Sequence, residues 1–252
     1  MLVDSHTHLL RLKVSPEVAV AGAAEEGVLA VVNVGTDVED SQEGAKLAAA
    51  LPNVYSSAGI HPHNAGTYSA AHLEALAELS ESPGIVALGE VGLDYYRSDW
   101  SKEIQRALFD DMISLANDTR LPLIIHSREA FDDTMAILSN ARVPIVLHCF
   151  EGGEREAIEA TERGYYLGLA GNVTYKNNRT AEILGILDPE RLLVETDAPY
   201  LSPQPVRRER NEPRYVIHTA SFVARGIGID DEEFGALTSR NARNLFGLPL
   251  GA

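Results

Sequence analysis

The sequence contains little cysteine, no long apolar run and few basic residues. Cys149 is the only cysteine in 252 residues, which excludes an intrachain disulfide and favours a reducing, cytoplasmic location. No stretch of about 18 apolar residues occurs, so we expect no transmembrane helix and no membrane partner. The N-terminus has no basic segment followed by an apolar stretch and a small-residue cleavage site, so we also expect no signal peptide.

The shortage of basic residues limits how the chain could bind nucleic acid. It has 21 Lys and Arg residues against 37 Asp and Glu residues, which gives a net charge of −16. This balance excludes a protein that coats duplex DNA by neutralising phosphates, because such a protein needs a basic face. A nuclease remains compatible with this negative charge, since bound divalent cations can supply positive charge locally. No feature indicates an obligate protein partner.

Apolar, β-branched segments alternate with helix-like stretches along the whole chain. With 45% hydrophobic and 23% charged residues, the chain is long enough to bury a substantial core. The alternation predicts an α/β fold with a parallel sheet, and eight strands indicate a (β/α)8 TIM barrel. We expect one domain over residues 1–252. The expected strands cover residues 2–8, 29–35, 54–62, 85–94, 121–128, 143–150, 165–172 and 191–199.

Local signals mark the boundaries of the expected helices. Residues 15–17 read Ser-Pro-Glu, an N-cap followed by a first-turn proline and an acid. Gly27, Gly164 and Gly226 each follow a helical run and are expected to cap its C-terminus. Residues 200–214 have no helical period and contain three prolines and four arginines, which predicts a long loop above the barrel. Two closing helices should follow.

Two histidines stand two residues apart at the start of the chain, in "DSHTHL". In a strand, His6 and His8 would point to the same face, as ligands of one metal ion do. Further polar residues stand at the ends of the other expected strands, and in a barrel those ends meet at one rim. They are Asn33, His61, His63, Glu90, Asp94, His126, His148, Asn172 and Asp197.

The residue types in this set indicate a metal centre. Imidazole with carboxylate suits zinc, manganese, iron or nickel better than a dedicated magnesium cage. Four of these histidines and two of the carboxylates already exceed the three protein ligands of one catalytic zinc site. They suffice for two adjacent metals bridged by a carboxylate, an arrangement typical of hydrolytic enzymes. We therefore expect two divalent ions, with magnesium, manganese and zinc all open.

Seven ordered motifs resemble those of the TatD family of metal-dependent deoxyribonucleases, in the amidohydrolase-like superfamily. They run from residue 4 to residue 213: "DSHTHL", "GIHPH", "GEVGLDYY", "IIHSREA", "LHCFEG", "ETDAPYLSP" and "RNEP". The resemblance implies a TIM barrel that cleaves phosphodiester bonds of DNA, often from the 3′ end, with a metal-activated water.

The resemblance also implies roles for individual residues. His6 and His8 would bind the first metal, and His126 and His148 the second. Glu90 would bridge the two metals. Asp197 would be the remaining ligand and would help to handle the proton of the water, which makes Glu90 and Asp197 the expected catalytic residues.

Four residues are expected to contact the substrate, a DNA strand end or short single strand. His61 and His63 would contact a phosphate or support the ligands, the alternative being a polar loop fixed by Pro62. Arg128 would grip a phosphate through its planar guanidinium, the alternative being a surface ion pair. Arg207, in the arginine-rich loop, would steer the polyanion.

The loop arginines and the overall activity leave further alternatives open. Arg207, Arg208 and Arg210 alternate with Glu209 and Glu212, so a solvated loop is equally consistent with the sequence. A small-molecule amidohydrolase, phosphoesterase or lactonase could use the same scaffold, because a fold does not determine a substrate. A non-catalytic, metal-stabilised binding protein is the alternative from another class. Asp94 is expected to orient a ligand histidine.

Overall fold

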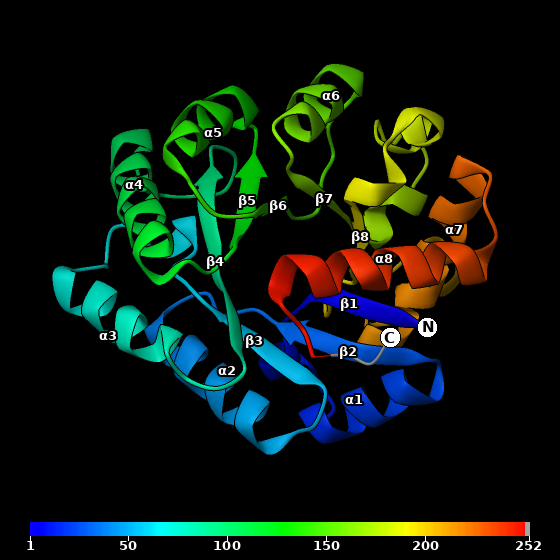
Figure 1. The fold of residues 1–252 in the computed structure, drawn as a ribbon, viewed down its shortest axis with the longest axis horizontal. Coiled ribbons are helices and arrows are strands. Elements are labelled where there is room, and N and C mark those ends of the chain that lie inside the picture. Colours follow the sequence, from blue (N-terminus) through cyan, green and yellow to red (C-terminus); the bar gives the residue numbers. More distant parts are fainter. Residues whose placement is uncertain (250–252) are drawn as a thin grey trace. The chain divides into compact units, whose positions relative to one another are not determined.

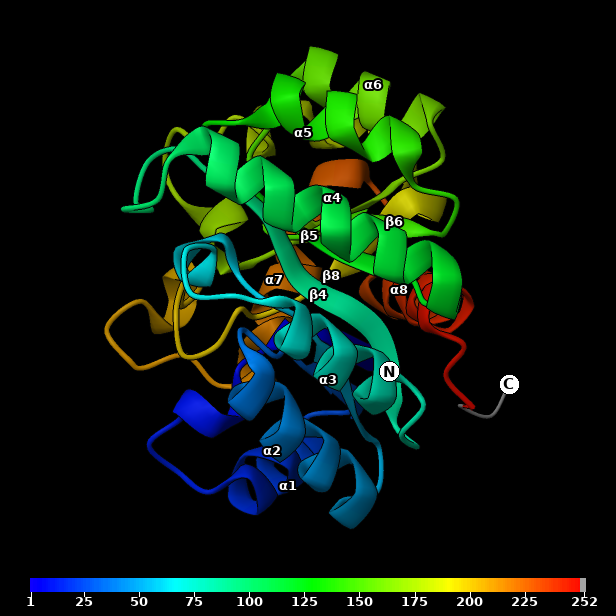
Figure 2. The same cartoon turned by 90° about the vertical axis from the view of Figure 1, so that its left-hand side faces the viewer.

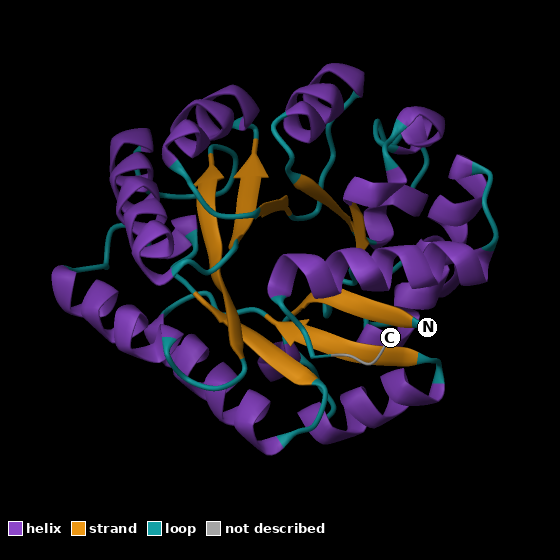
Figure 3. Cartoon of the chain, in the orientation of Figure 1, coloured by secondary structure: helices purple, strands orange, loops and turns teal. Residues whose placement is uncertain are grey.

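The computed structural model describes residues 1–249, in which strands alternate with helices from end to end (Figure 3). The strands are β1 (Leu2–Thr7), β2 (Val28–Asn33), β3 (Val54–Ala58), β4 (Ile85–Asp94), β5 (Leu123–Arg128), β6 (Ile145–Leu147), β7 (Tyr166–Leu169) and β8 (Leu192–Val194). The α-helices are α1 (Pro16–Glu25), α2 (Val38–Ala50), α3 (Ala70–Ser80), α4 (Lys102–Thr119), α5 (Phe131–Ile137), α6 (Glu154–Glu162), α7 (Val216–Ile227) and α8 (Asp231–Phe246).

The eight strands belong to one sheet in the order β1 to β8, which is the strand order of a TIM barrel. The predicted α/β class, the strands and the two closing helices are therefore confirmed. The connection between β7 and β8 is an exception, since it holds short 3₁₀ segments in place of an α-helix. Its apolar run, Ala181–Ile186, lies between Asn178 and Pro189 and is too short to sustain a longer helix.

The chain divides into two compact units, which are described separately. The first comprises residues 1–33 and 148–252. Within it β1 pairs with β2 and β7 pairs with β8, both in parallel. A parallel bridge from Thr7 to Ala198 joins β1 to the end of β8. Helix α8, red in Figure 1, lies across β1 and buries Phe234 completely.

The second unit comprises residues 34–147 and holds β3 to β6, all parallel. Helix α3 lies between α2 and α4 on the outside of these strands (Figure 2). Leu108, Phe109 and Met112 of α4 are completely buried, which supplies the apolar contact between helix and sheet. That both units form one domain stays a prediction.

Capping residues define the helix ends largely as the sequence predicts. The side chain of Ser15 accepts a hydrogen bond from the amide of Val18 at the start of α1. The prediction for Gly226 was wrong, because this residue lies inside α7 and packs against Leu184. The left-handed C-cap of α7 is Gly228, with φ of 87°, so the positive φ falls two residues after the predicted position.

The predicted loop over residues 200–214 is present and contains only single 3₁₀ turns. Within residues 1–249, no helix is both long enough and apolar enough to span a bilayer.

Candidate metal centre

The first unit contains a buried cluster of imidazoles and carboxylates, which we call the first cluster. Two backbone hydrogen bonds between β1 and the segment after β8 bring it together: His8 donates to Ala198, and Asp197 donates to His6. His148 follows β6 directly and stacks on His6, with ring centroids 3.9 Å apart. The members of the first cluster are His6, His8, His148, Glu195 and Asp197.

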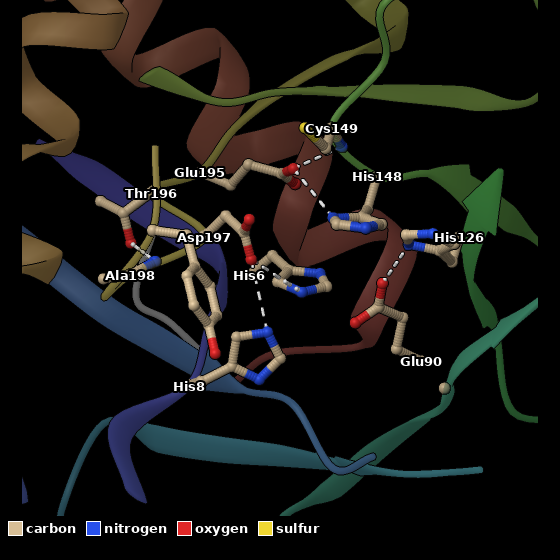
Figure 4. Close-up of polar contacts among 12 residues, drawn as sticks. His6, His8, Glu90, His126, His148, Cys149, Glu195, Thr196, Asp197 and Ala198 are labelled. Atoms are coloured by element: carbon tan, nitrogen blue, oxygen red, sulfur yellow. Dashed lines mark hydrogen bonds and ion pairs between the residues drawn. The ribbon is translucent and has the colours of Figure 1, made fainter. Parts of the chain in front are cut away.

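Asp197 faces both histidines of the "HTH" motif. Its Oδ1 lies 3.3 Å from Nε2 of His8 and 3.7 Å from Nε2 of His6, and Figure 4 shows the three side chains pointing toward one another. Burial raises the pKa of Asp197, but His8, His6 and His148 outweigh burial and hold the pKa below its usual range. The carboxylate is therefore ionised at neutral pH, as a metal ligand must be.

Two residues beside this cluster have positive backbone φ without being glycine. Cys149 has φ of 46° and Asp197 has φ of 53°. Such conformations cost free energy in non-glycine residues and gather at functional sites. Burial and the nearby Asp197 and Glu195 carboxylates raise the pKa of the Cys149 thiol well above its usual range. A protonated thiol is no nucleophile, so catalysis by Cys149 is disfavoured.

The second unit contains its own group of titratable side chains at the ends of β3, β4 and β5, which we call the second cluster. Glu90 is only 3% exposed. Its Oε1 lies 2.7 Å from Nδ1 of His126 and 3.6 Å from Nε2 of His61. The dashed line in Figure 4 marks the contact between Glu90 and His126. The members of the second cluster are His61, His63, Glu90, Asp94 and His126.

Asp94 contacts two histidines and two backbone amides in and beside the second cluster. Its Oδ2 lies 2.8 Å from Nε2 of His63 and 3.3 Å from Nε2 of His126. Its Oδ1 accepts hydrogen bonds from the amides of Tyr96 and Arg97. Burial raises the pKa of Asp94, but His126, the Arg97 amide and His63 outweigh it and hold the pKa well below its usual range. An ionised carboxylate next to His126 is the contact that the predicted orienting role requires, and the role itself stays a prediction.

Both clusters have the donor atoms and spacing of metal sites. The ligand atoms of His6, His148 and Glu195 lie within 4.8 Å of one another, as do those of His61, Glu90 and His126. Nitrogen and oxygen donors on rigid strand ends fit a divalent transition metal or magnesium. The chemistry of the donor set thus agrees with a metal-dependent enzyme.

The two arginines predicted to hold substrate each lie over a tyrosine ring. The guanidinium of Arg128 is 4.5 Å from the ring centroid of Tyr96, and that of Arg207 is 4.3 Å from Tyr175. Among the described residues, neither arginine forms an ion pair with a carboxylate. The alternative of a surface ion pair for Arg128 is therefore not found in residues 1–249.

Comparisons with known proteins identify the family. A family model described as TatD related DNase matches residues 3–247. The chain belongs to the TatD family. The 3'-5' ssDNA/RNA exonuclease TatD of Citrobacter rodentium is 37% identical over 241 residues, which cover 92% of this chain and 91% of the relative.

Two further relatives match this TatD-family chain over almost its whole length. A protein of Bacillus subtilis named as the uncharacterized metal-dependent hydrolase YabD is 35% identical and covers 98% of the chain and 99% of the relative. The crystal structure of YJJV, a TatD homologue of Escherichia coli K12, matches with a TM-score of 0.93 and 28% identity over 98% of each chain. The predictions of a TIM-barrel fold and of a metal-dependent hydrolase are therefore confirmed.

The structure adds one residue to the first cluster that the sequence analysis of this TatD-family chain missed. Glu195 is 1% exposed, accepts a hydrogen bond from the amide of Cys149 at 2.6 Å and lies 3.4 Å from Nδ1 of His148. Gly168 makes room for it, because a Cβ there would come within 2.3 Å of the carboxylate. The signal was available, since Glu195 directly follows the apolar run Leu192–Val194.

A buried pair of polar residues holds β1 against the end of β8 in the first unit. Asp4 accepts hydrogen bonds from the amide and the hydroxyl of Thr196, at 2.9 and 2.6 Å. Burial raises the pKa of Asp4 to about 8, because the hydrogen bonds from Thr196 only partly offset it. This pair fixes the strand ends from which His6 and Asp197 project.

Proposed function

We propose that the protein is a metal-dependent 3′–5′ exonuclease that acts on single-stranded DNA or RNA. The observation that carries this proposal is the presence of two buried imidazole and carboxylate clusters at strand ends in a chain of the TatD family. The relatives named as exonucleases of single-stranded DNA and RNA support the choice of substrate.

We assign the ligands as the motifs imply. His6 and His8 would hold one divalent ion and His126 and His148 the other, with Glu90 contributing to both and Asp197 as the remaining ligand. This assignment requires residues 1–252 to work as one domain. Bound divalent cations supply what these side chains lack, namely neutralisation of phosphate oxygens and a lower pKa for an attacking water.

The remaining steps belong to side chains of the chain itself. Asp197 accepts the proton of the attacking water, for which its depressed pKa keeps it ionised. Glu195 orients His148 through Nδ1, and Asp94 orients His126 through Nε2. Arg128 and Arg207 hold phosphates, because each guanidinium has no carboxylate partner within residues 1–249.

The test is metal analysis of protein purified without chelators, followed by activity on a 5′-labelled single-stranded oligonucleotide with magnesium, manganese or zinc. We expect bound metal and a ladder of products that shorten from the 3′ end, with RNA compared in parallel. Release of the 5′ label as a mononucleotide from the first time point, with no ladder, would contradict the direction.

A matched panel decides between a nuclease and a small-molecule hydrolase on the same scaffold. Cyclic nucleotides, lactones and sugar phosphates are assayed beside the oligonucleotide. Turnover of a panel compound, with no cleavage of either nucleic acid under any ion, would refute the exonuclease proposal. Bound metal without turnover of any compound would support a binding protein.

A further inference from the structure

An exposed aromatic ring lies next to the second cluster and has no role in the proposed metal chemistry. Of the aromatic side chains, all of which fall within residues 1–249, only Tyr96 and Tyr200 are exposed. Tyr200 lies edge to face with His8. Tyr96 is 59% exposed and follows the end of β4 by two residues, so a large part of the residue is accessible to solvent.

The neighbours of Tyr96 are cations. Arg128 lies 4.5 Å and Arg97 lies 6.0 Å from its ring centroid. Among the described residues, neither guanidinium is paired with a carboxylate. A ring that stacks and a guanidinium that binds phosphate are the two groups that proteins combine to hold single-stranded nucleic acid.

The turn that carries Tyr96 is rigidly attached to the second cluster. One oxygen of Asp94 accepts hydrogen bonds from the Tyr96 and Arg97 amides, while the other contacts His63 and His126. The indole of Trp100 donates to the backbone carbonyl of His63 at 2.9 Å. A base stacked on Tyr96 would therefore sit at a fixed position relative to Glu90 and His126, which is what an exonuclease needs to register the scissile phosphate.

We propose that Tyr96 is a stacking platform for one nucleobase near the 3′ end of the substrate, and that Arg128 binds a phosphate of the same strand. The inference rests on the proposed exonuclease function and adds a base subsite to it. Stacking does not depend on the identity of the base, because every base has a π-face. The platform therefore provides affinity and register without sequence preference.

The experiment combines Tyr96→Ala with abasic substrates. For an unmodified oligonucleotide, we expect the variant to raise KM roughly tenfold while kcat changes far less. Tyr96→Phe and Tyr96→Trp keep a ring and should retain a KM within about twofold of the parent. In a second series, a single abasic site is placed in turn at each of the last three nucleotides of the oligonucleotide. At one of these positions the abasic site should raise the KM of the parent as much as Tyr96→Ala does. On that substrate Tyr96→Ala should cause no further rise in KM.

Tyr166→Ala is the matched control, because Arg191 lies 5.2 Å from the Tyr166 ring but this residue begins β7 at its amino end. We expect that variant to keep both kinetic constants, and all variants to keep the parent's metal content. An unchanged KM for Tyr96→Ala, or an equal loss on every abasic substrate, would overturn the platform.

Failure of the platform and failure of the exonuclease proposal give different results. If the parent protein cleaves no oligonucleotide, the exonuclease proposal fails, and the platform is then tested by anisotropy with a fluorescein-labelled single strand. Weaker binding by Tyr96→Ala, with wild-type binding by Tyr166→Ala, would still support it. Equal binding by both variants, or no binding by the parent, would refute it.

Discussion

Replacement of Asp94 by asparagine separates its two tasks. The amide oxygen of Asp94→Asn can keep the hydrogen bonds from the amides of Tyr96 and Arg97, which span 2.9 and 2.7 Å. The other oxygen becomes an NH₂ group that faces Nε2 of His63 and His126, so the variant loses a charged acceptor behind these imidazoles.

The size of the effect follows from burial. A hydrogen bond to a charged group is worth about 1.5–3 kcal/mol, but solvent screens this contact at His63, whose side chain is 42% exposed. His126 is 17% exposed, so we expect the loss to act mainly through this ligand. Loss of an orienting carboxylate typically lowers metal affinity or activity about 10- to 100-fold, and we expect that range for Asp94→Asn.

The assay is a metal titration against a competing chelator, together with kcat and KM on a single-stranded oligonucleotide. Asp94→Asn should weaken metal binding and lower kcat, with KM nearly unchanged because the Tyr96 turn persists. Asp94→Ala should weaken metal binding similarly and also raise KM. Wild-type metal affinity and kcat in Asp94→Asn would refute the view that this carboxylate positions His126.

Three further predictions concern other parts of the site. Glu90→Ala should abolish metal-dependent turnover while the circular dichroism spectrum is kept, and wild-type activity with any metal would contradict the two-metal assignment. Arg207→Ala should raise KM for oligonucleotides more than it lowers kcat. Arg208→Ala removes an arginine with no ring contact among the described residues and should raise KM less. Equal increases of KM in steady-state assays would count against a specific role for Arg207. The raised pKa of Asp4 means that the folded state binds its proton more tightly than the unfolded state, so this group's contribution to stability is present below about pH 4 and falls as pH rises toward about 8. In metal-free protein with chelator, the free energy of unfolding of the parent relative to Asp4→Asn should therefore decrease over this interval by up to about 1.4 kcal/mol per pH unit, and urea melts at pH 5 and pH 7.5 that show a constant difference would contradict the assigned burial.

The sequence predicted the fold because its signals are local and repeated. Each strand is a short apolar run. His126 and His148 follow such a run directly, and Glu90 and Asp197 follow one within three residues, so these ligands could be placed near strand ends without any tertiary information. The grouping of His126 with Glu90, and of His8 with Asp197, then follows from parallel strands that end at the same edge.

What the sequence could not predict depends on tertiary packing. Gly226 and Gly228 are both plausible helix ends, and only the packing of Gly226 against Leu184 decides between them. The pairing of Arg128 with Tyr96 joins residues 32 positions apart. Arg128 ends β5 and pairs with Asp94, the last residue of β4, which places it near Tyr96 in the turn that follows. Neither contact has a periodic signature along the chain.

The contacts of individual arginines explain how a chain with a net negative charge could bind a polyanionic substrate. Several arginines are neutralised by carboxylates, such as Arg106 by Asp133 and Arg240 by Glu190. Arg128 and Arg207 contact tyrosine rings instead, which leaves their donors available for the phosphates that we propose they bind. Two such cations and the two proposed metal ions would neutralise only a few phosphates. A duplex footprint needs many more, so these few cations in a chain of net charge −16 favour a strand end over a duplex.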